Sequence, residues 1–200
     1  SESAQYAEAR EAAERAVELA PEVADGWTML GTVLAGALEP EKARDAFAKA
    51  LQLKPLQPRV LLSMGHVEKT IGDSRASEIA YDEAFRIDPS LGEAMWSKAD
   101  LKTYRFRPEE IETMKRQLDK DISNTSDVAA FHFALGKAYG DDQASERSFS
   151  HYQSGNSIKA ELEPFPMEEF KSRNKQIRSA FSSPPNNVKG ANESPTPIFI

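Results

Sequence analysis

A period of 34 residues constrains the fold of this chain more than any other feature of its sequence. Proline recurs at this spacing as Pro21, Pro55 and Pro89. Other residue types keep the same phase: Ala16, Ala50 and Ala84, then Gly31 and Gly65, then Phe47 and Tyr81. A chance period in an alanine-rich helical protein would not hold so many residue types together. We therefore expect a stack of similar helical units, each burying its apolar side against the next.

The first complete unit runs from Ala24 to Gln57. Its characteristic residues are Trp27, Leu30, Gly31, Leu34, Ala43, Phe47, Ala50 and Pro55. Their order and spacing match the tetratricopeptide repeat (TPR) pattern, except that Leu34 stands where an aromatic residue is usual. Small residues let two antiparallel helices approach closely, large residues fill the space between units, and proline ends each unit. The predicted fold class is all-α, a right-handed TPR superhelix (an α-α solenoid) with a concave groove.

The phase of the pattern sets the expected divisions of the chain. It holds to residue 91, fails where Lys98 and Lys115 replace a leucine and an aromatic residue, and returns at Phe131. The last residues are rich in proline, asparagine and serine, which indicates a linker. The first division contains the TPR units at 1–91, which are a half unit at 1–23 and full units at 24–57 and 58–91. An atypical helix pair follows at 92–126, with its helices at Leu91 to Tyr104 and Pro108 to Ile122. The remaining divisions are a TPR-like unit at 127–163, a terminal helix at 164–181, and a linker with the start of a missing domain at 182–200.

Composition excludes several classes of function. The 200 residues carry a net charge of −7 and include no cysteine and three histidines. We therefore expect no disulfide and no metal site. No apolar run is long enough to cross a membrane and no secretory signal is visible, so a cytoplasmic location is expected. The acidic balance argues against nucleic acid as a partner.

The predicted groove lies along the first helices of the units, where residues four apart share a face. Candidate partner-binding residues are Thr28, Thr32 and Ala35 in the first full unit, Leu62, His66 and Lys69 in the second, and Phe133 and Lys137 in the TPR-like unit. They favour a protein or peptide ligand, in extended or helical form. The alternative is a solvated face without a ligand. A clamp for a C-terminal carboxylate, as in chaperone-binding TPRs, is not expected, because Thr28, Thr32 and Ser63 replace its cationic and amide donors.

The atypical pair and the charges add further candidates. Trp96, Asp100 and Tyr104 fall four residues apart, so they form either an aromatic anchor site or part of the core. His132 and His151 are expected to be packing residues, because no nucleophile or orienting acid accompanies them. The first hundred residues hold 18 acidic and 11 basic side chains, which indicates either a groove for basic ligands or a solvated outer face.

Several motifs in the second half of the chain go together. They are Pro108 to Ile111, Phe131 to Tyr139, Asp141 with Asp142, His151 to Asn156 with Gly155, and the apolar Pro197 to Ile200. In this order they resemble the helical region of TPR-containing sulfotransferases, from about Gly92 to Ile200. In that family the last strand leads into a loop that binds the 5′-phosphosulfate end of the sulfate donor PAPS.

The resemblance implies a binding function for this chain and assigns the catalytic residues to a separate domain. No phosphate-binding loop is present in the sequence, so no catalytic, cofactor or metal residue is assigned. The implied function is a partner-binding module in the N-terminal region of a sulfotransferase, recruiting an acceptor to a domain that would bind PAPS. The alternative is a stand-alone TPR scaffold for complex assembly. Whether the parent protein is an enzyme stays open, and this chain alone is not expected to be one.

Overall fold

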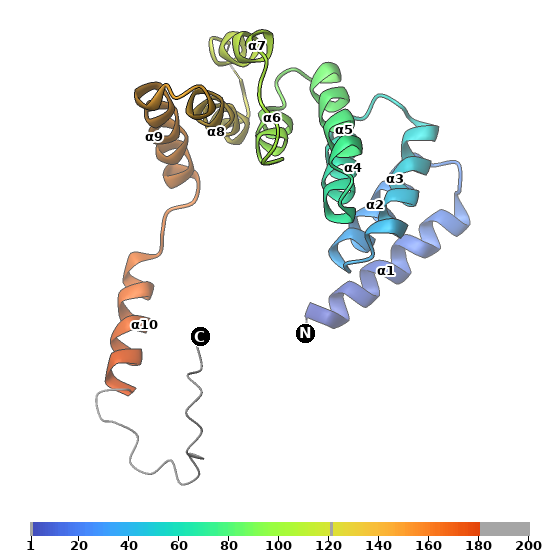
Figure 1. Cartoon of the computed structure of the whole chain (residues 1–200). Helices are drawn as coiled ribbons and strands as arrows, with labels where there is room; N and C mark the ends of the chain where they lie inside the picture. The colour runs from blue at the N-terminus through green and yellow to red at the C-terminus, as the bar shows by residue number, and fades with distance from the viewer. Residues whose placement is uncertain (1, 121, 181–200) are drawn as a thin grey trace, which may run out of the picture. The chain divides into compact units, whose positions relative to one another are not determined.

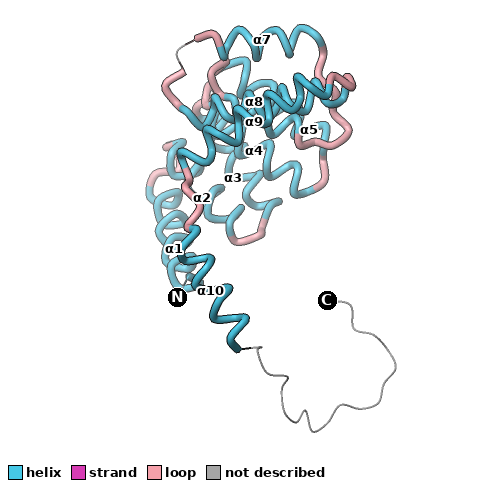
Figure 2. The backbone as a smooth tube through the Cα atoms, turned by 90° about the vertical axis from the view of Figure 1, so that its left-hand side faces the viewer, coloured by secondary structure: helices cyan, strands magenta, loops and turns pink. Residues whose placement is uncertain are grey.

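The structure is a computed structural model that describes residues 2–120 and 122–180. Every regular element within these ranges is an α-helix, as Figure 2 shows in cyan. The helices are α1 (Glu2–Leu19), α2 (Ala24–Gly36), α3 (Pro40–Leu53), α4 (Pro58–Ile71), α5 (Ser74–Ile87), α6 (Gly92–Ala99), α7 (Pro108–Leu118), α8 (Thr125–Asp141), α9 (Ser145–Leu162) and α10 (Met167–Ala180). The predicted linker and strand at 182–200 lie outside the described residues.

The chain divides into two units, Ser1–Leu162 and Glu163–Ile200. In the first unit each helix from α1 to α5 packs against the next, α6 packs against α8, and α8 packs against α9 (Figure 1). In the described part of the second unit, α10 is an exposed helix, and the ring of Phe165, which precedes it, meets the Phe170 ring edge to face at 5.4 Å. The regular packing of consecutive helices is the arrangement that the 34-residue period predicts.

Proline, glycine and short polar residues mark the helix ends. Pro21, Pro55 and Pro89 each follow the last residue of a helix by two positions, where their missing N–H breaks no helical hydrogen bond. Gly72 closes α4 in the left-handed region with φ of +100°, which favours glycine. The Asp73 side chain then accepts a hydrogen bond from the Ala76 N–H at 2.9 Å and caps α5.

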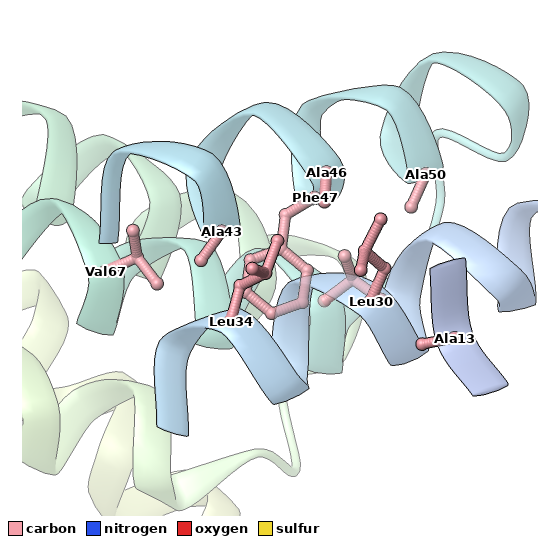
Figure 3. Close-up of a cluster of buried hydrophobic side chains, with 9 residues drawn as sticks. Ala13, Leu30, Leu34, Ala43, Ala46, Phe47, Ala50 and Val67 are labelled. Carbon is pink, nitrogen blue, oxygen red and sulfur yellow. The ribbon is translucent and has the colours of Figure 1, made fainter. Parts of the chain in front are cut away.

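The core of the first units surrounds Phe47 of α3. Figure 3 shows this ring directed at Leu30 and Leu34 of α2, with Ala13 of α1 and Val67 of α4 contributing to the same cluster. All these side chains are at least nine-tenths buried. The cluster therefore joins four consecutive helices, as expected for units that cannot bury their apolar sides alone.

An aromatic ring lying on a glycine is the repeated contact between paired helices. A Cβ added at Gly31 would lie 2.7 Å from the Phe47 ring, and one at Gly65 would lie 2.3 Å from the Tyr81 ring. The same contact returns in the last pair, where a Cβ at Gly136 would lie 3.1 Å from the Tyr152 ring. Glycine is needed at these positions because the ring occupies the space of a side chain.

The segment predicted to be an atypical helix pair differs from that prediction. Helix α6 ends at Ala99 rather than at Tyr104, and α7 ends at Leu118 rather than at Ile122. Moreover, α6 packs against α5 and α8, while α7 packs against α8, so α6 and α7 do not form a closely packed pair. The contact between α6 and α7 is ionic: Lys98 of α6 is fully buried and pairs with Glu110 of α7, and also with Asp82 of α5.

Candidate functional site

The first helices of the units, α2, α4, α6 and α8, carry most of the predicted binding residues on one connected surface, which we call the first-helix face. It contains a pocket between α2 and α4, a polar bridge from α4 to α6, and a second pocket between α6 and α8. The connection is a contact between one lining residue of each pocket: His66 lines the first pocket and contacts Glu93, which lines the second.

The first pocket has a volume of about 300 Å³ and contains no ionised side chain at neutral pH. Its lining residues are Thr32, Ala35, Leu38, Pro40, Phe47, Ser63, His66, Val67 and Thr70. The Thr32 hydroxyl donates to the Thr28 carbonyl at 2.9 Å, and the Thr28 hydroxyl donates to the Ala24 carbonyl at 3.1 Å. With these hydroxyls satisfied locally, the pocket presents mainly carbon to a ligand.

Two polar contacts, of which one is an ion pair, form the bridge between the pockets. Lys69 of α4 pairs with Asp100 at the end of α6, and His66 Nε2 lies 3.9 Å from Glu93 Oε1. His66 Nδ1 also shares a hydrogen bond of 3.0 Å with the Tyr81 hydroxyl. Burial lowers the pKa of His66, against the opposing effect of Glu93 and with a smaller contribution from Lys69. The imidazole is therefore neutral at pH 7, and its contact with Glu93 is not an ion pair there.

The second pocket, which we call the Trp96 pocket, has a volume of about 310 Å³. Its lining residues are Glu93, Trp96, Asn124, Ser126, Asp127, Ala129, Ala130, Phe133 and Lys159. The Trp96 and Phe133 rings lie 5.4 Å apart between centroids, inclined at 48°. Aromatic walls with a few polar groups at the rim are typical of sites that bind a side chain of a partner.

Buried Asp127 holds this pocket together. Its Oδ1 accepts from the Glu93 backbone N–H at 3.0 Å, and its Oδ2 accepts from Asn124 Nδ2 at 2.6 Å. A Cβ at Gly92 would lie only 2.1 Å from the Asp127 carbonyl oxygen, so glycine permits the close approach of α6 to α8. Sequence reasoning missed Glu93, Asn124 and Asp127. The spacing of Asn124 and Asp127 at a helix start was the signal that could have found the last two.

The other predicted residues are placed differently. The prediction that Leu62 binds a partner is wrong. Its side chain is 5% exposed and packs in the core with Tyr81 and Leu91, so it is not on the exposed surface of α4. Lys137 is half-buried, where its Nζ donates to the Tyr104 carbonyl at 2.7 Å and pairs with Asp141. Trp96 lies in the helix, but Asp100 and Tyr104 follow its end, so the expected face of three side chains on one helix does not form.

Tyr104 belongs instead to a buried ionic cluster that the sequence did not reveal. Lys98 Nζ donates to Asp82 and, at 2.6 Å, to Glu110, and it lies 4.3 Å from the Tyr104 ring centroid. The Tyr104 hydroxyl donates to Glu110 at 2.7 Å. Glu110 also accepts from the Arg107 backbone N–H at 2.8 Å. The cluster joins α5, α6 and α7, and its members are satisfied by one another.

His132 of α8 and His151 of α9 form a further pair. Their Nδ1 atoms are 3.0 Å apart, so one imidazole donates a hydrogen bond to the other. The Tyr139 ring stacks on His151 with centroids 5.4 Å apart. Within the described ranges no group of three or more histidine, aspartate or glutamate side chains is arranged to hold a metal ion. None of the helices in residues 2–120 and 122–180 combines the length and apolar character needed to cross a membrane.

No family model and no curated protein matches the sequence. Solved structures do match the fold. A crystal structure of MamA is similar with a TM-score of 0.60 and 12% identity, over 82% of this chain and 94% of that protein. A MamA double mutant gives 0.58 and 16%, over 80% and 88%. YrrB, described as "a TPR protein with an unusual peptide-binding site", gives 0.56 and 15%, over 86% of each chain. Together with the helical array, these similarities establish the fold as an all-α, TPR-type α-α solenoid.

Proposed function

We propose that the first-helix face binds a protein or peptide partner. The main evidence for this proposal is spatial: an apolar pocket, a polar bridge and an aromatic pocket follow one another along α2, α4, α6 and α8. Such a surface offers anchor sites for side chains and a polar strip between them, which suits a peptide lying across the helices. The similarity of the fold to YrrB, whose description names a peptide-binding site, supports the proposal.

Filling the first pocket tests this proposal. Thr32→Trp adds a large side chain to the rim of the pocket, since Thr32 is exposed and lines it. The matched control is Ala48→Trp, an exposed position on α3 outside the pocket. A synthetic peptide array identifies binders, and fluorescence anisotropy then measures their affinities. We expect Thr32→Trp to weaken binding about tenfold or more, which is about 1.4 kcal/mol, and the control to leave it unchanged.

Two results would contradict the proposal. One is an array without any binder, which removes the peptide-binding function. The other is equal binding by wild type and Thr32→Trp, which moves the site away from this face. We expect both variants to retain the fold, because neither substitution enters the core, and thermal unfolding checks this.

We also propose that the bound partner is an acceptor recruited for sulfation by a sulfotransferase in the cytoplasm. The resemblance of Phe131 to Asn156 and of Pro108 to Ile111 to the helical region of TPR-containing sulfotransferases supports this extension. Recruitment would raise the effective concentration of the acceptor at a linked catalytic domain. The alternative remains a scaffold that assembles proteins without an enzymatic partner.

The two versions differ in what surrounds the module. If the sulfotransferase hypothesis is right, the parent gene should encode a glycine-rich phosphate-binding loop shortly after Ile200. A stop codon there would exclude this hypothesis and leave the scaffold as the remaining function. The sulfotransferase hypothesis assigns PAPS to the linked catalytic domain, because the residues of this chain include no phosphate-binding loop motif. Calorimetry with PAPS and this chain alone should accordingly show no binding heat, and measurable binding would place a donor site within the 200 residues.

A further inference from the structure

The Trp96 pocket differs in chemistry from the first pocket. Its walls are the Trp96 and Phe133 rings, and the Glu93 carboxylate stands at its edge with about half of its side chain exposed. An indole face attracts a cation through its quadrupole, and a carboxylate within reach supplies the opposite charge. The first pocket has neither feature, because its lining is neutral and mainly aliphatic.

The positions of both rings are set by the backbone around them. Gly92 and the Asp127 side chain fix the start of α6 against the start of α8, which places Glu93 and Trp96 at the pocket. On the other side, a Cβ at Gly155 of α9 would lie 2.8 Å from the Phe133 ring. Phe133 therefore rests on a glycine and is held beside Trp96. The pocket is formed by three helices before any ligand arrives.

The charge at the pocket favours a cationic ligand. The side chain facing Glu93 across the bridge is His66, which is neutral at pH 7 because burial lowers its pKa. The carboxylate of Asp127 already accepts two hydrogen bonds, so Glu93 is the more accessible anion. Lys159 of α9 also lines the pocket and gives it one positive side chain. The first hundred residues carry 18 acidic against 11 basic groups, which favours encounter with a basic partner.

We propose that the Trp96 pocket receives an arginine side chain of the peptide bound to the first-helix face. The guanidinium plane lies on the Trp96 ring and pairs with Glu93, while the aliphatic stem contacts Phe133. Arginine fits better than lysine because its planar guanidinium both stacks and forms a forked hydrogen bond with a carboxylate. This inference rests on the proposed peptide-binding function and names the partner as a peptide with an arginine anchor.

A double-mutant cycle with citrulline tests the proposal. Citrulline has nearly the shape of arginine but no charge. Peptides that bind on the array are resynthesised with arginine, citrulline, lysine or glutamate at each basic position, and anisotropy measures their affinities. With the wild-type protein we expect replacement of one arginine by citrulline to weaken binding about tenfold. With Glu93→Gln that difference should fall to less than about twofold.

Controls separate the pocket from the net charge of the protein. Glu41→Gln makes the same change of charge at an exposed position on α3, outside both pockets, and should keep the full preference for arginine. Trp96→Leu removes the indole and should reduce the preference. Since Glu93 is exposed, Glu93→Gln is expected to fold normally, and thermal unfolding checks this.

Three outcomes overturn the arginine proposal while leaving peptide binding intact. One is equal affinity for arginine and citrulline peptides, and another is a preference for arginine that persists in Glu93→Gln. The third is selection of glutamate that is lost in Lys159→Gln, which would assign an anionic side chain to the pocket. If no peptide binds at all, or if Thr32→Trp changes nothing, the proposed function itself fails, so the two failures are distinguishable.

Discussion

Lys98 stands at the centre of a connected group of polar side chains that includes Asp82, Tyr104 and Glu110. Burial alone would lower the pKa of its amine, but hydrogen bonds to Asp82 and Glu110 outweigh that effect and raise it. Burial likewise opposes ionisation of Glu110, yet hydrogen bonds from Lys98, Arg107 and Tyr104 lower its pKa to about 2. Both groups are therefore charged at neutral pH. The low pKa of Glu110 stabilises the fold at every pH at which the Glu110 carboxyl of the unfolded chain is also ionised.

Removing one partner of this pair should cost more than removing both charges. Glu110→Gln leaves the buried ammonium of Lys98 with Asp82 alone, and we expect a loss of about 3 kcal/mol in the free energy of unfolding. The double variant Lys98→Met/Glu110→Gln should lose less, because no buried cation remains. Urea denaturation at pH 7 measures both values. A double variant less stable than Glu110→Gln would show that the ion pair itself, rather than an uncompensated charge, dominates.

The contact of a ring with a glycine gives a second prediction at the scale of one residue. In Gly65→Ala the new Cβ would lie 2.3 Å from the Tyr81 ring, which is itself 1% exposed and cannot move freely. We expect a loss of about 1 to 3 kcal/mol, as for other overpacked cores. Gly26→Ala is the control, because its Cβ would meet Val17 at an ordinary 3.4 Å. The control should be neutral or stabilising by up to about 1 kcal/mol in the same urea experiment, since alanine favours the helix.

At the scale of helices, the repeat pattern predicted what depends on local spacing. Pro55 follows the end of α3, and the small residues Gly31 and Gly65 lie where two helices approach closely, both as the period indicates. That the rings of Phe47 and Tyr81 lie on these glycines was not predicted. The pattern did not predict contacts between residues that lie outside the 34-residue repeat. Lys98 looked like a wrong residue at a core position, because its partners Asp82 and Glu110 belong to other helices.

The candidate site was predictable to a similar degree. His66 and Thr32 were found because positions four apart on a first helix share a face, and both line the first pocket. Leu62 was misplaced because spacing alone does not tell the outer side of α4 from the side that meets Tyr81. Glu93 was missed because its role depends on Asp127, a residue of another unit that fixes the start of α6.

The contact between α8 and α9 should weaken in acid. The pKa values of His132 and His151 are both lowered, mainly by burial, and for His151 also by His132 and Lys115. Besides Lys115, the Tyr139 ring stacks on His151 and the Arg147 guanidinium lies over the Tyr139 ring. Because a histidine in the unfolded chain titrates near 6.5, the unfolded state binds more protons below that pH. The stabilisation is therefore complete above pH 6.5 and declines as the pH falls through the lowered values.

Thermal unfolding between pH 8 and pH 5 checks this prediction. We expect the melting temperature of the wild type to fall over the acid half of the range, more steeply than that of His132→Asn/His151→Asn, which has no imidazole at this contact. Parallel curves for the two proteins would mean that the pair does not contribute to the pH dependence. Glu110 adds little pH dependence above pH 5, because even the free carboxyl, with an ordinary pKa of 4.5, is mostly ionised there, and both proteins contain Glu110.

Among the described residues of the unit Ser1–Leu162, the apolar core consists of three clusters rather than one centre. The first joins α1 to α4, the second α4 to α6, and the third reaches from α5 to α8. The first and second clusters share α4, and the second and third share α6. Stability is therefore close to a sum of local terms between neighbouring helices, as in other solenoids.

A core substitution in one cluster should accordingly loosen its own helices first. Phe47→Ala removes the ring that joins α2 to α3 and that lies on Gly31. We expect a loss of about 3 to 5 kcal/mol for the first cluster. Native-state hydrogen exchange should then show a large loss of protection in α1 to α4 and a small one in α8 and α9, which share no cluster with Phe47. Tyr152→Ala reverses the test, since its ring packs on Gly136 of α8. If either variant loses protection equally in all helices, the unit unfolds as one cooperative body and the local description is wrong.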